Sequence, residues 1–242
     1  MSIWLALGAF AIGVAAAAAQ AVAGFGFALL AVPLFALLIG AKSGVASAAA
    51  LGLVLTATIA WRERAHIDSR TASRAVLPAL LGIPLGLLVI RSVSDRALSI
   101  VIGTVVLGFT ALLATEQPIP AGRATVWLGG FLSGVLATST GTNGPPLVIA
   151  FQATRMRPHV FRATLAIVFM IEGAIALLLF ALADTTTRTS WLVALSGVPG
   201  AALGWWLGDH LFSRIDPRRF RIVILVMLAS SAVVAIASAL TR

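Results

Sequence analysis

The chain has 242 residues, of which 60% are hydrophobic and only 10% are charged. A soluble domain is usually about 25% charged, so this composition excludes an ordinary water-soluble fold and predicts an integral membrane protein. The net charge is +9, but the basic residues lie in short gaps between apolar runs. That placement indicates contact with the headgroups of a lipid bilayer and no nucleic-acid partner. Because cysteine is absent, disulfides and thiolate metal sites are excluded.

The apolar segments predict an all-α membrane fold. Two of them, 28–40 and 145–153, are too short to cross a bilayer at about 1.5 Å of rise per residue. The first segment lacks the basic start of a signal peptide, since the first basic residue is Lys42, and it is interpreted as a retained helix. In chain order the segments are 3–22, 28–40, 43–61, 75–91, 96–115, 124–140, 145–153, 160–183, 190–208 and 218–240.

Each short segment follows a cluster of helix-breaking residues, at 23–27 and at 138–146. Glycine admits backbone angles that a helix interior does not use, and proline is favoured in the first helical turn. Each cluster therefore predicts a helix–break–helix unit. Such a unit either crosses the membrane or turns back as a re-entrant hairpin.

The distribution of basic residues favours a hairpin for the second unit. If both units turn back, twelve basic residues share one side of the membrane and five lie opposite, whereas a single crossing by the second unit splits them seven against ten. The positive-inside rule then places both termini outside, which is periplasmic in a bacterium. No charged residue precedes the first unit, so the charge distribution cannot test whether it turns back. A hairpin is expected there because the two halves of the chain have the same layout. The twelve are Arg62, Arg64, Arg70, Arg74, Arg123, Arg155, Arg157, Arg162, Arg214, Arg218, Arg219 and Arg221, and the five are Lys42, Arg91, Arg96, Arg188 and Arg242.

That symmetry is a predicted internal repeat. Each half contains a broken hairpin followed by three spans, and the Gly-x-Pro sequences that begin at Gly82 and Gly197 occupy equivalent positions. Three spans per half is an odd number, so the second copy is expected to be inverted, an arrangement typical of transporters. Counting each hairpin once gives about eight membrane segments. The repeats are 1–118 (hairpin 3–40, spans 43–61, 75–91 and 96–115) and 119–242 (hairpin 124–153, spans 160–183, 190–208 and 218–240).

The two breaks predict an anion-binding site. In this layout the helices that begin near Phe27 and Pro145 start at the bilayer centre, with their N-termini facing each other. A helix N-terminus presents unpaired N–H groups and a partial positive charge. The alternative is that the breaks are packing kinks whose hydroxyl groups bond back to their own helices. The predicted substrate-binding residues are Gln20, Gly24, Phe25, Gly26, Thr140, Gly141, Thr142, Asn143, Gly144 and Gln152.

Two charged residues are further candidates. Glu172 is an acid near the middle of segment 160–183, and a carboxyl at that depth is a hypothesis of function, here proton coupling. The alternative is a protonated or hydrogen-bonded glutamate packed between helices. Arg162 opens the same segment, where it either attracts anions toward the site or anchors the helix at the headgroups.

Short motifs around both breaks resemble a known family. Gly24-Phe25-Gly26, Val32-Pro33-Leu34, the run 141–147 and Arg162-Ala163-Thr164 are similar to the TauE/SafE family of membrane transporters. The resemblance covers essentially the whole chain. It implies a secondary transporter in the bacterial inner membrane that exports sulfite, sulfoacetate or a related organosulfonate, although some relatives take substrates up. Where many relatives carry a longer glycine run, this chain has Gly24-Phe25-Gly26-Phe27.

An intramembrane enzyme is the main alternative class. An intramembrane serine or zinc protease needs histidine within a span or a His-Glu-x-x-His motif, and neither is present. We therefore expect no enzyme, no cofactor and no metal. An anion channel, or an importer of another small organic anion, stays as the alternative. We expect alternating access around a midplane site, and a homodimer is left open.

Overall fold

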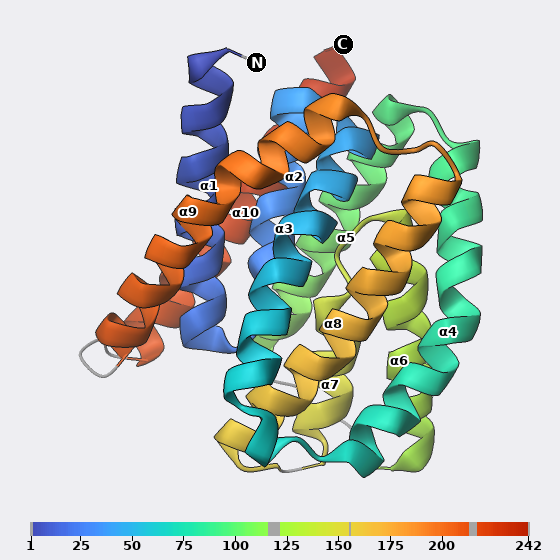
Figure 1. Cartoon of the computed structure of the whole chain (residues 1–242), viewed down its shortest axis with the longest axis vertical. Coiled ribbons are helices and arrows are strands. Elements are labelled where there is room, and N and C mark those ends of the chain that lie inside the picture. Colours follow the sequence, from blue (N-terminus) through green and yellow to red (C-terminus); the bar gives the residue numbers. More distant parts are fainter. Residues whose placement is uncertain (1, 116–121, 155, 213–216, 242) are drawn as a thin grey trace.

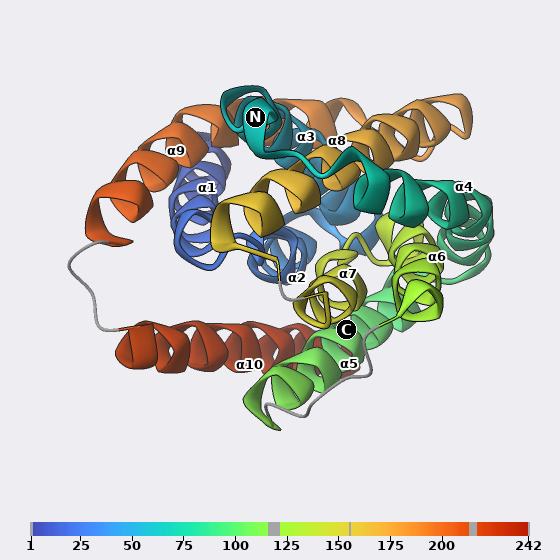
Figure 2. The same ribbon diagram turned by 90° about the horizontal axis from the view of Figure 1, so that it is seen from below.

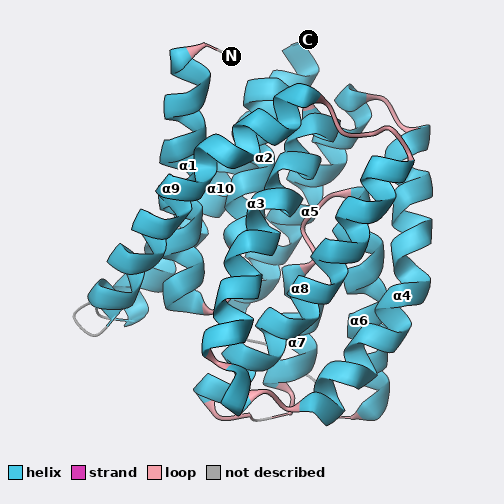
Figure 3. Ribbon diagram, viewed as in Figure 1, coloured by secondary structure: helices cyan, strands magenta, loops and turns pink. Residues whose placement is uncertain are grey.

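The computed structural model describes residues 2–115, 122–154, 156–212 and 217–241, and these ranges contain helices and no strand (Figure 3). Six of the helices are long and apolar enough to cross a membrane, which confirms an all-helical, multi-pass membrane protein. The six are α1, α3, α4, α5, α8 and α9. The elements are α1 (Ile3–Ala23), α2 (Phe27–Ile39), α3 (Ala41–Arg62), the 3-10 turn η1 (Arg64–His66), α4 (Ser69–Ser92), α5 (Asp95–Thr115), α6 (Arg123–Ser139), α7 (Gly144–Gln152), α8 (Pro158–Leu182), α9 (Arg188–Phe212) and α10 (Pro217–Thr241).

Each broken unit is an antiparallel pair of helices. A methyl group placed on Gly8, near the start of α1, would lie 3.2 Å from Leu38 at the end of α2. A methyl on Gly129 in α6 would likewise lie 2.7 Å from Ala150 in α7. The first unit enters from the end of the bundle that holds both termini, and the second enters from the opposite end (Figure 1).

The arms of these units are unequal in length. With 21 residues, α1 is about 31 Å long and can cross a bilayer alone, whereas α2 has 13 residues and α7 only nine. The depth of both breaks in the membrane therefore stays a prediction. The predicted repeat boundary at 118/119 and the basic residues Arg155, Arg214 and Arg242 lie outside the described residues.

The first of two unusually close helix pairs is α1 with α9. A methyl on Gly200 would lie 2.1 Å from the carbonyl oxygen of Phe10, and one on Gly204 would lie 2.1 Å from that of Val14. Because both residue numbers rise together along the contact, the two helices run parallel. Glycines four residues apart bring backbones into direct contact, as in many membrane helix pairs.

The second close pair, α4 with α6, is built in the same way. Methyl groups on Gly130 and Gly134 would lie 2.2 and 2.1 Å from the carbonyl oxygens of Ala75 and Ala79. These helices also run parallel to each other, but they start from the end of the bundle opposite to the start of α1 and α9 (Figure 1). In the order of the predicted repeats, α1 corresponds to α6 and α9 to α4.

The remaining contacts place the broken units inside the bundle. The helices α3 and α8 pack against each other, and α5 and α10 lie side by side along one face (Figure 2). Buried apolar side chains form a larger cluster centred on α2 and α3 and a smaller one around α7. Large apolar side chains such as Leu81 and Leu195 are exposed, as expected of a surface that faces lipid.

One polar contact ties the end of the first broken unit to α5. The Asp95 carboxylate accepts a hydrogen bond of 2.9 Å from the backbone N–H of Ala41, the first residue of α3. Loss of a helix cap typically costs about 0.5–2 kcal/mol. We expect Asp95→Ala to lower the thermal unfolding midpoint in detergent by a few degrees, at about 2–4 °C per kcal/mol. Asp95→Asn, which keeps an acceptor, should lose less, and an unchanged midpoint in Asp95→Ala would contradict this role.

Candidate functional site

The two breaks meet in the interior of the bundle. The Phe25 ring reaches to 4.0 Å from the position of a methyl on Gly144, so the first break touches the start of α7. The second break rests on α2, where a methyl on Gly141 would lie 3.0 Å from Val32. Gly26 and Gly141 have φ angles of 105° and 69°, a left-handed conformation that glycine adopts readily. The glycines in both clusters therefore permit the chain reversals that bring the breaks together.

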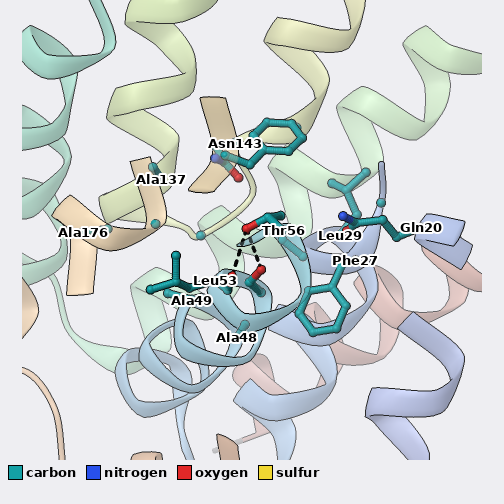
Figure 4. A pocket seen from close by; sticks show the side chains of 17 residues that line it. Gln20, Phe27, Leu29, Ala48, Ala49, Leu53, Thr56, Ala137, Asn143 and Ala176 are labelled. Atoms are coloured by element: carbon teal, nitrogen blue, oxygen red, sulfur yellow. Dashed lines mark hydrogen bonds between the residues drawn. The ribbon is translucent and has the colours of Figure 1, made fainter. Parts of the chain in front are cut away.

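A cavity of about 60 Å³ lies between the breaks. One water needs about 10–15 Å³ of such space, so this volume accommodates a few waters or one small oxyanion. Figure 4 shows that the lining comes from both broken units and from the paired helices α3 and α8. The lining residues are Gln20, Gly26, Phe27, Ala28, Leu29, Ala48, Ala49, Gly52, Leu53, Thr56, Ala137, Gly141, Asn143, Gly144, Phe169, Gly173 and Ala176.

Three neutral polar side chains reach this cavity from three different elements: Gln20 from α1, Thr56 from α3 and Asn143 from the second break (Figure 4). The Thr56 hydroxyl donates to the Gly52 carbonyl at 2.8 Å, which leaves its oxygen as an acceptor. Gln20 is only 4% exposed, and its side chain makes no hydrogen bond with another described residue. Its amide is therefore available to a ligand. No lining residue is charged.

Backbone N–H groups add to these donors, chiefly at the start of α2. Phe27, Ala28 and Leu29 form the first turn of α2 and line the cavity, and no side chain caps that helix. First-turn N–H groups have no partner within their own helix, and they carry the positive end of the helix dipole. The start of α7 is poorer in donors than the sequence suggested, because Pro145 and Pro146 have no N–H.

A buried carboxyl lies directly behind Asn143. Glu172 in α8 is 1% exposed, and its Oε2 accepts hydrogen bonds from the Asn143 side-chain amide at 2.5 Å and from the Ser133 hydroxyl at 2.9 Å. Among the described residues its Oε1 has no partner. Asn143 thus touches the cavity on one side and the buried acid on the other.

Arg162 lies at the edge of the first break and does not line the cavity. Its side chain packs on Gly24, where an added methyl would lie 2.9 Å from the Arg162 Cγ. Its guanidinium carbon lies 5.6 Å from the centre of the Trp205 ring in α9, a cation–π distance. Arg162 therefore joins α8 to both α1 and α9.

Comparison with known proteins shows the family of this chain. The model of the family described as sulfite exporter TauE/SafE matches residues 9–235. The chain belongs to the TauE/SafE family. It is also 28% identical, over 88% of its length and 87% of the relative's, to a protein of Cupriavidus necator named probable sulfite/organosulfonate exporter TauE. No solved structure matches the chain.

The motifs that carry the TauE/SafE resemblance hold elements together around the site. Thr164 accepts a hydrogen bond of 3.1 Å from the backbone N–H of Asp68, which fixes the start of α4 against α8. Asp68 in turn caps α4, and a hydrogen bond from the Thr71 hydroxyl lowers its pKa below the ordinary value. The Arg162-Ala163-Thr164 sequence therefore anchors α8 to three neighbouring helices.

The structure gathers most, but not all, of the sequence-predicted residues at the cavity. Gln20, Gly26, Gly141, Asn143 and Gly144 line it, and Gly24 and Phe25 adjoin it at the first break. The hydroxyl groups of Thr140 and Thr142 lie 2.7 Å apart in a fully buried pair and do not line the cavity. Gln152 is exposed at the far end of α7, about 12 Å along the helix from Gly144, so it is not brought to the site.

Sequence reasoning missed two polar residues, Thr56 and Ser133. Thr56 continues a line of small residues on one face of α3, Ala48 and Gly52, at intervals of four. Ser133 lies one turn before Ala137, which lines the cavity, in the helix that leads to the second break. A polar side chain on the small-residue face of a span would have been the signal for both.

Proposed function

We propose that this protein is a secondary transporter that carries a small sulfur-containing anion, sulfite or an organosulfonate, through the cavity between the two breaks. The observation that carries this proposal is a small interior cavity with neutral hydrogen-bond donors from both broken units. The uncapped start of α2 and the amides of Gln20 and Asn143 supply those donors. Such groups bind oxyanions at helix N-termini without a buried arginine.

Family membership and the named relative support the substrate class and the direction. The relative is named as a probable sulfite/organosulfonate exporter, so we propose export across a bacterial inner membrane, with both termini in the periplasm. The sulfonate group presents three acceptor oxygens, which suits a site made largely of N–H donors. The exporter family also supports transport over enzymatic chemistry.

The arrangement of the helices supports alternating access by two inverted halves. The close pairs α1–α9 and α4–α6 are equivalent in the proposed repeat order and run in opposite directions (Figure 1). The cavity lies between the two broken units, and α3 and α8 line it from equivalent positions. Rocking of one half against the other would open such a cavity to each side in turn.

The environment of Glu172 supports proton coupling. Its carboxyl is buried, bonds to the cavity residue Asn143, and leaves Oε1 without a partner in the described structure. Burial of an ionised carboxylate with one oxygen unpaired is costly. The arrangement therefore suits a group that gains and loses a proton during transport.

Ligand binding to the purified protein tests the function. We expect one sulfur anion from a panel of sulfite, sulfate, sulfoacetate, taurine, acetate and phosphate to raise the thermal unfolding midpoint selectively. A ligand at about 100 times its Kd stabilises the folded state by about 2.7 kcal/mol, a shift of several degrees. No shift with any of these anions would contradict the proposal. Flux through proteoliposomes that does not saturate would instead indicate a channel.

A further inference from the structure

Ser133 has one hydroxyl hydrogen and two acceptors. Its Oγ lies 2.9 Å from the Glu172 Oε2 and 3.0 Å from the backbone carbonyl oxygen of Asn143, and Ser133 is fully buried. A hydroxyl can donate only one strong hydrogen bond at a time. The two acceptors therefore compete for the same hydrogen. Asn143 is the residue that precedes α7 and also lines the cavity.

The charge of Glu172 decides this competition. A hydrogen bond to a carboxylate is roughly twice as strong as one to a neutral acceptor, so ionised Glu172 draws the Ser133 hydrogen to Oε2. When Glu172 takes a proton from water and becomes neutral, that advantage disappears and the hydrogen turns to the Asn143 carbonyl. The same proton weakens the bond from the Asn143 side-chain amide to Oε2. That amide is then freer to donate to a ligand.

Among the described residues, no other charged side chain bonds to the Glu172 carboxyl. The elements with the most extensive contacts to α8 are η1, α3, α4, α6 and α7, and the end of α1 and α9 meet α8 at Arg162. The charged side chains of α3 and α6 are confined to their end turns, and those of α4 (Arg70, Arg74 and Arg91) lie within two turns of its ends. η1 carries Arg64 and His66 beyond the end of α3, α7 has no charged residue, and on α8 itself His159 and Arg162 precede Glu172 by ten residues or more. The groups in contact with the Glu172 carboxyl are the neutral side chains of Ser133 and Asn143.

We propose that Ser133 is a positioning residue that relays the protonation of Glu172 to the start of α7, so that the cavity binds its anion more tightly when Glu172 is protonated. Protonation fixes the Asn143 carbonyl, releases the Asn143 amide and removes a negative charge next to the anion. The relay rests on the proposed function, because it supplies the link by which that function couples anion to proton. It adds a step that Glu172 alone does not provide.

Calorimetric binding of sulfoacetate to detergent-purified protein at about pH 6 and about pH 8 tests the relay. Both acidic groups of this ligand stay ionised in that range, so its own charge does not change. We expect the wild-type Kd to rise by about tenfold from the lower to the higher pH, within the usual range of coupling between linked sites. In Ser133→Ala the change should fall to about threefold, because amide release and charge removal do not pass through the hydroxyl, whereas Ser133→Thr, which keeps the hydroxyl, should retain the full change.

Ser231→Ala is the matched control. Ser231 is a buried serine in α10 whose hydroxyl donates to Leu228 of its own helix at 3.0 Å, so its loss should leave the wild-type pH dependence intact. If the Ser133→Ala variant bound sulfoacetate with the full wild-type pH dependence, the relay would be overturned, but the proposed transport function would stand. Wild-type binding that is equal at both pH values would do the same. Absence of sulfoacetate binding by the wild type, together with no shift in the anion panel, would overturn the function itself.

Discussion

Replacing Asn143 with alanine is expected to weaken binding of the transported anion by about ten- to a hundredfold. A hydrogen bond to a charged group contributes about 1.5–3 kcal/mol, and about 1.4 kcal/mol corresponds to a factor of ten in Kd. Asn143 lines the cavity and its side chain donates a hydrogen bond to Glu172, so its loss removes a donor and disconnects the buried acid. Calorimetric titration of wild type and variant with the anion selected from the panel measures the change directly.

Two other side-chain amides, Gln20 and Gln152, test whether the effect is specific to the cavity. Gln20→Ala should also weaken binding, because Gln20 lines the cavity from α1. Gln152→Ala should bind like the wild type, because Gln152 is exposed at the far end of α7. Unchanged affinity in Asn143→Ala would show that the anion binds elsewhere. A loss in Gln152→Ala would favour the placement expected from sequence over the one found in the structure.

Replacing Glu172 with glutamine is expected to abolish the response of transport to a proton gradient. Glutamine keeps the size of the side chain and an acceptor for Ser133 and Asn143, but it cannot exchange a proton. Anion flux driven by an imposed pH gradient in proteoliposomes should fall by at least about tenfold. Exchange of labelled for unlabelled anion at a single pH should continue, because it needs no net proton movement. The two assays together separate loss of coupling from loss of the carrier.

Glu63→Gln is the control for that change of charge. Glu63 lies at the end of α3 and pairs with His66 at 3.2 Å on the surface of the bundle. Exposed pairs of this kind contribute little to stability, so both assays should match the wild type. If Glu172→Gln responded to the gradient as the wild type does, the buried carboxyl would be a structural group and the coupling hypothesis would be wrong.

The breaks were predictable from clusters of glycine, and of proline at the second break, between apolar runs. The expected helices at 28–40 and 145–153 begin within one residue of α2 and α7, whereas the Gly-x-Pro sequences that begin at Gly82 and Gly197 lie inside the continuous helices α4 and α9. The polar identity of Asn143 and the depth of Glu172 within its segment were equally visible in the chain. What these residues share, a single contact between them, depends on the packing of α6, α7 and α8.

The sequence misplaced one site residue and missed two others, because their positions depend on how the helices are rotated and which helices pack together. Gln152 was expected at the site because it is polar and close in sequence, but eight residues of helix carry it away from the start of α7. Thr56 was overlooked because it lies within an ordinary apolar span, and only the packing of α3 against α8 turns it inward. The importance of Ser133 depends on its two hydrogen-bond acceptors, which belong to Asn143 and Glu172 on other segments. The contacts themselves leave no local pattern, although a polar side chain on the small-residue face of a span was a signal for both Thr56 and Ser133.

The glycine contacts of α1 with α9 and of α4 with α6 also have a mechanical consequence. Where Gly204 meets Val14 and Gly134 meets Ala79, the two backbones are in direct contact, with no side chain between them. If one helix slid along the other, carbonyl oxygens would clash with Cα atoms at every turn. Each pair is therefore expected to move as one rigid unit. If the proposed alternating access operates, we expect the movement to occur between these two helix pairs, along α3 and α8, which line the cavity.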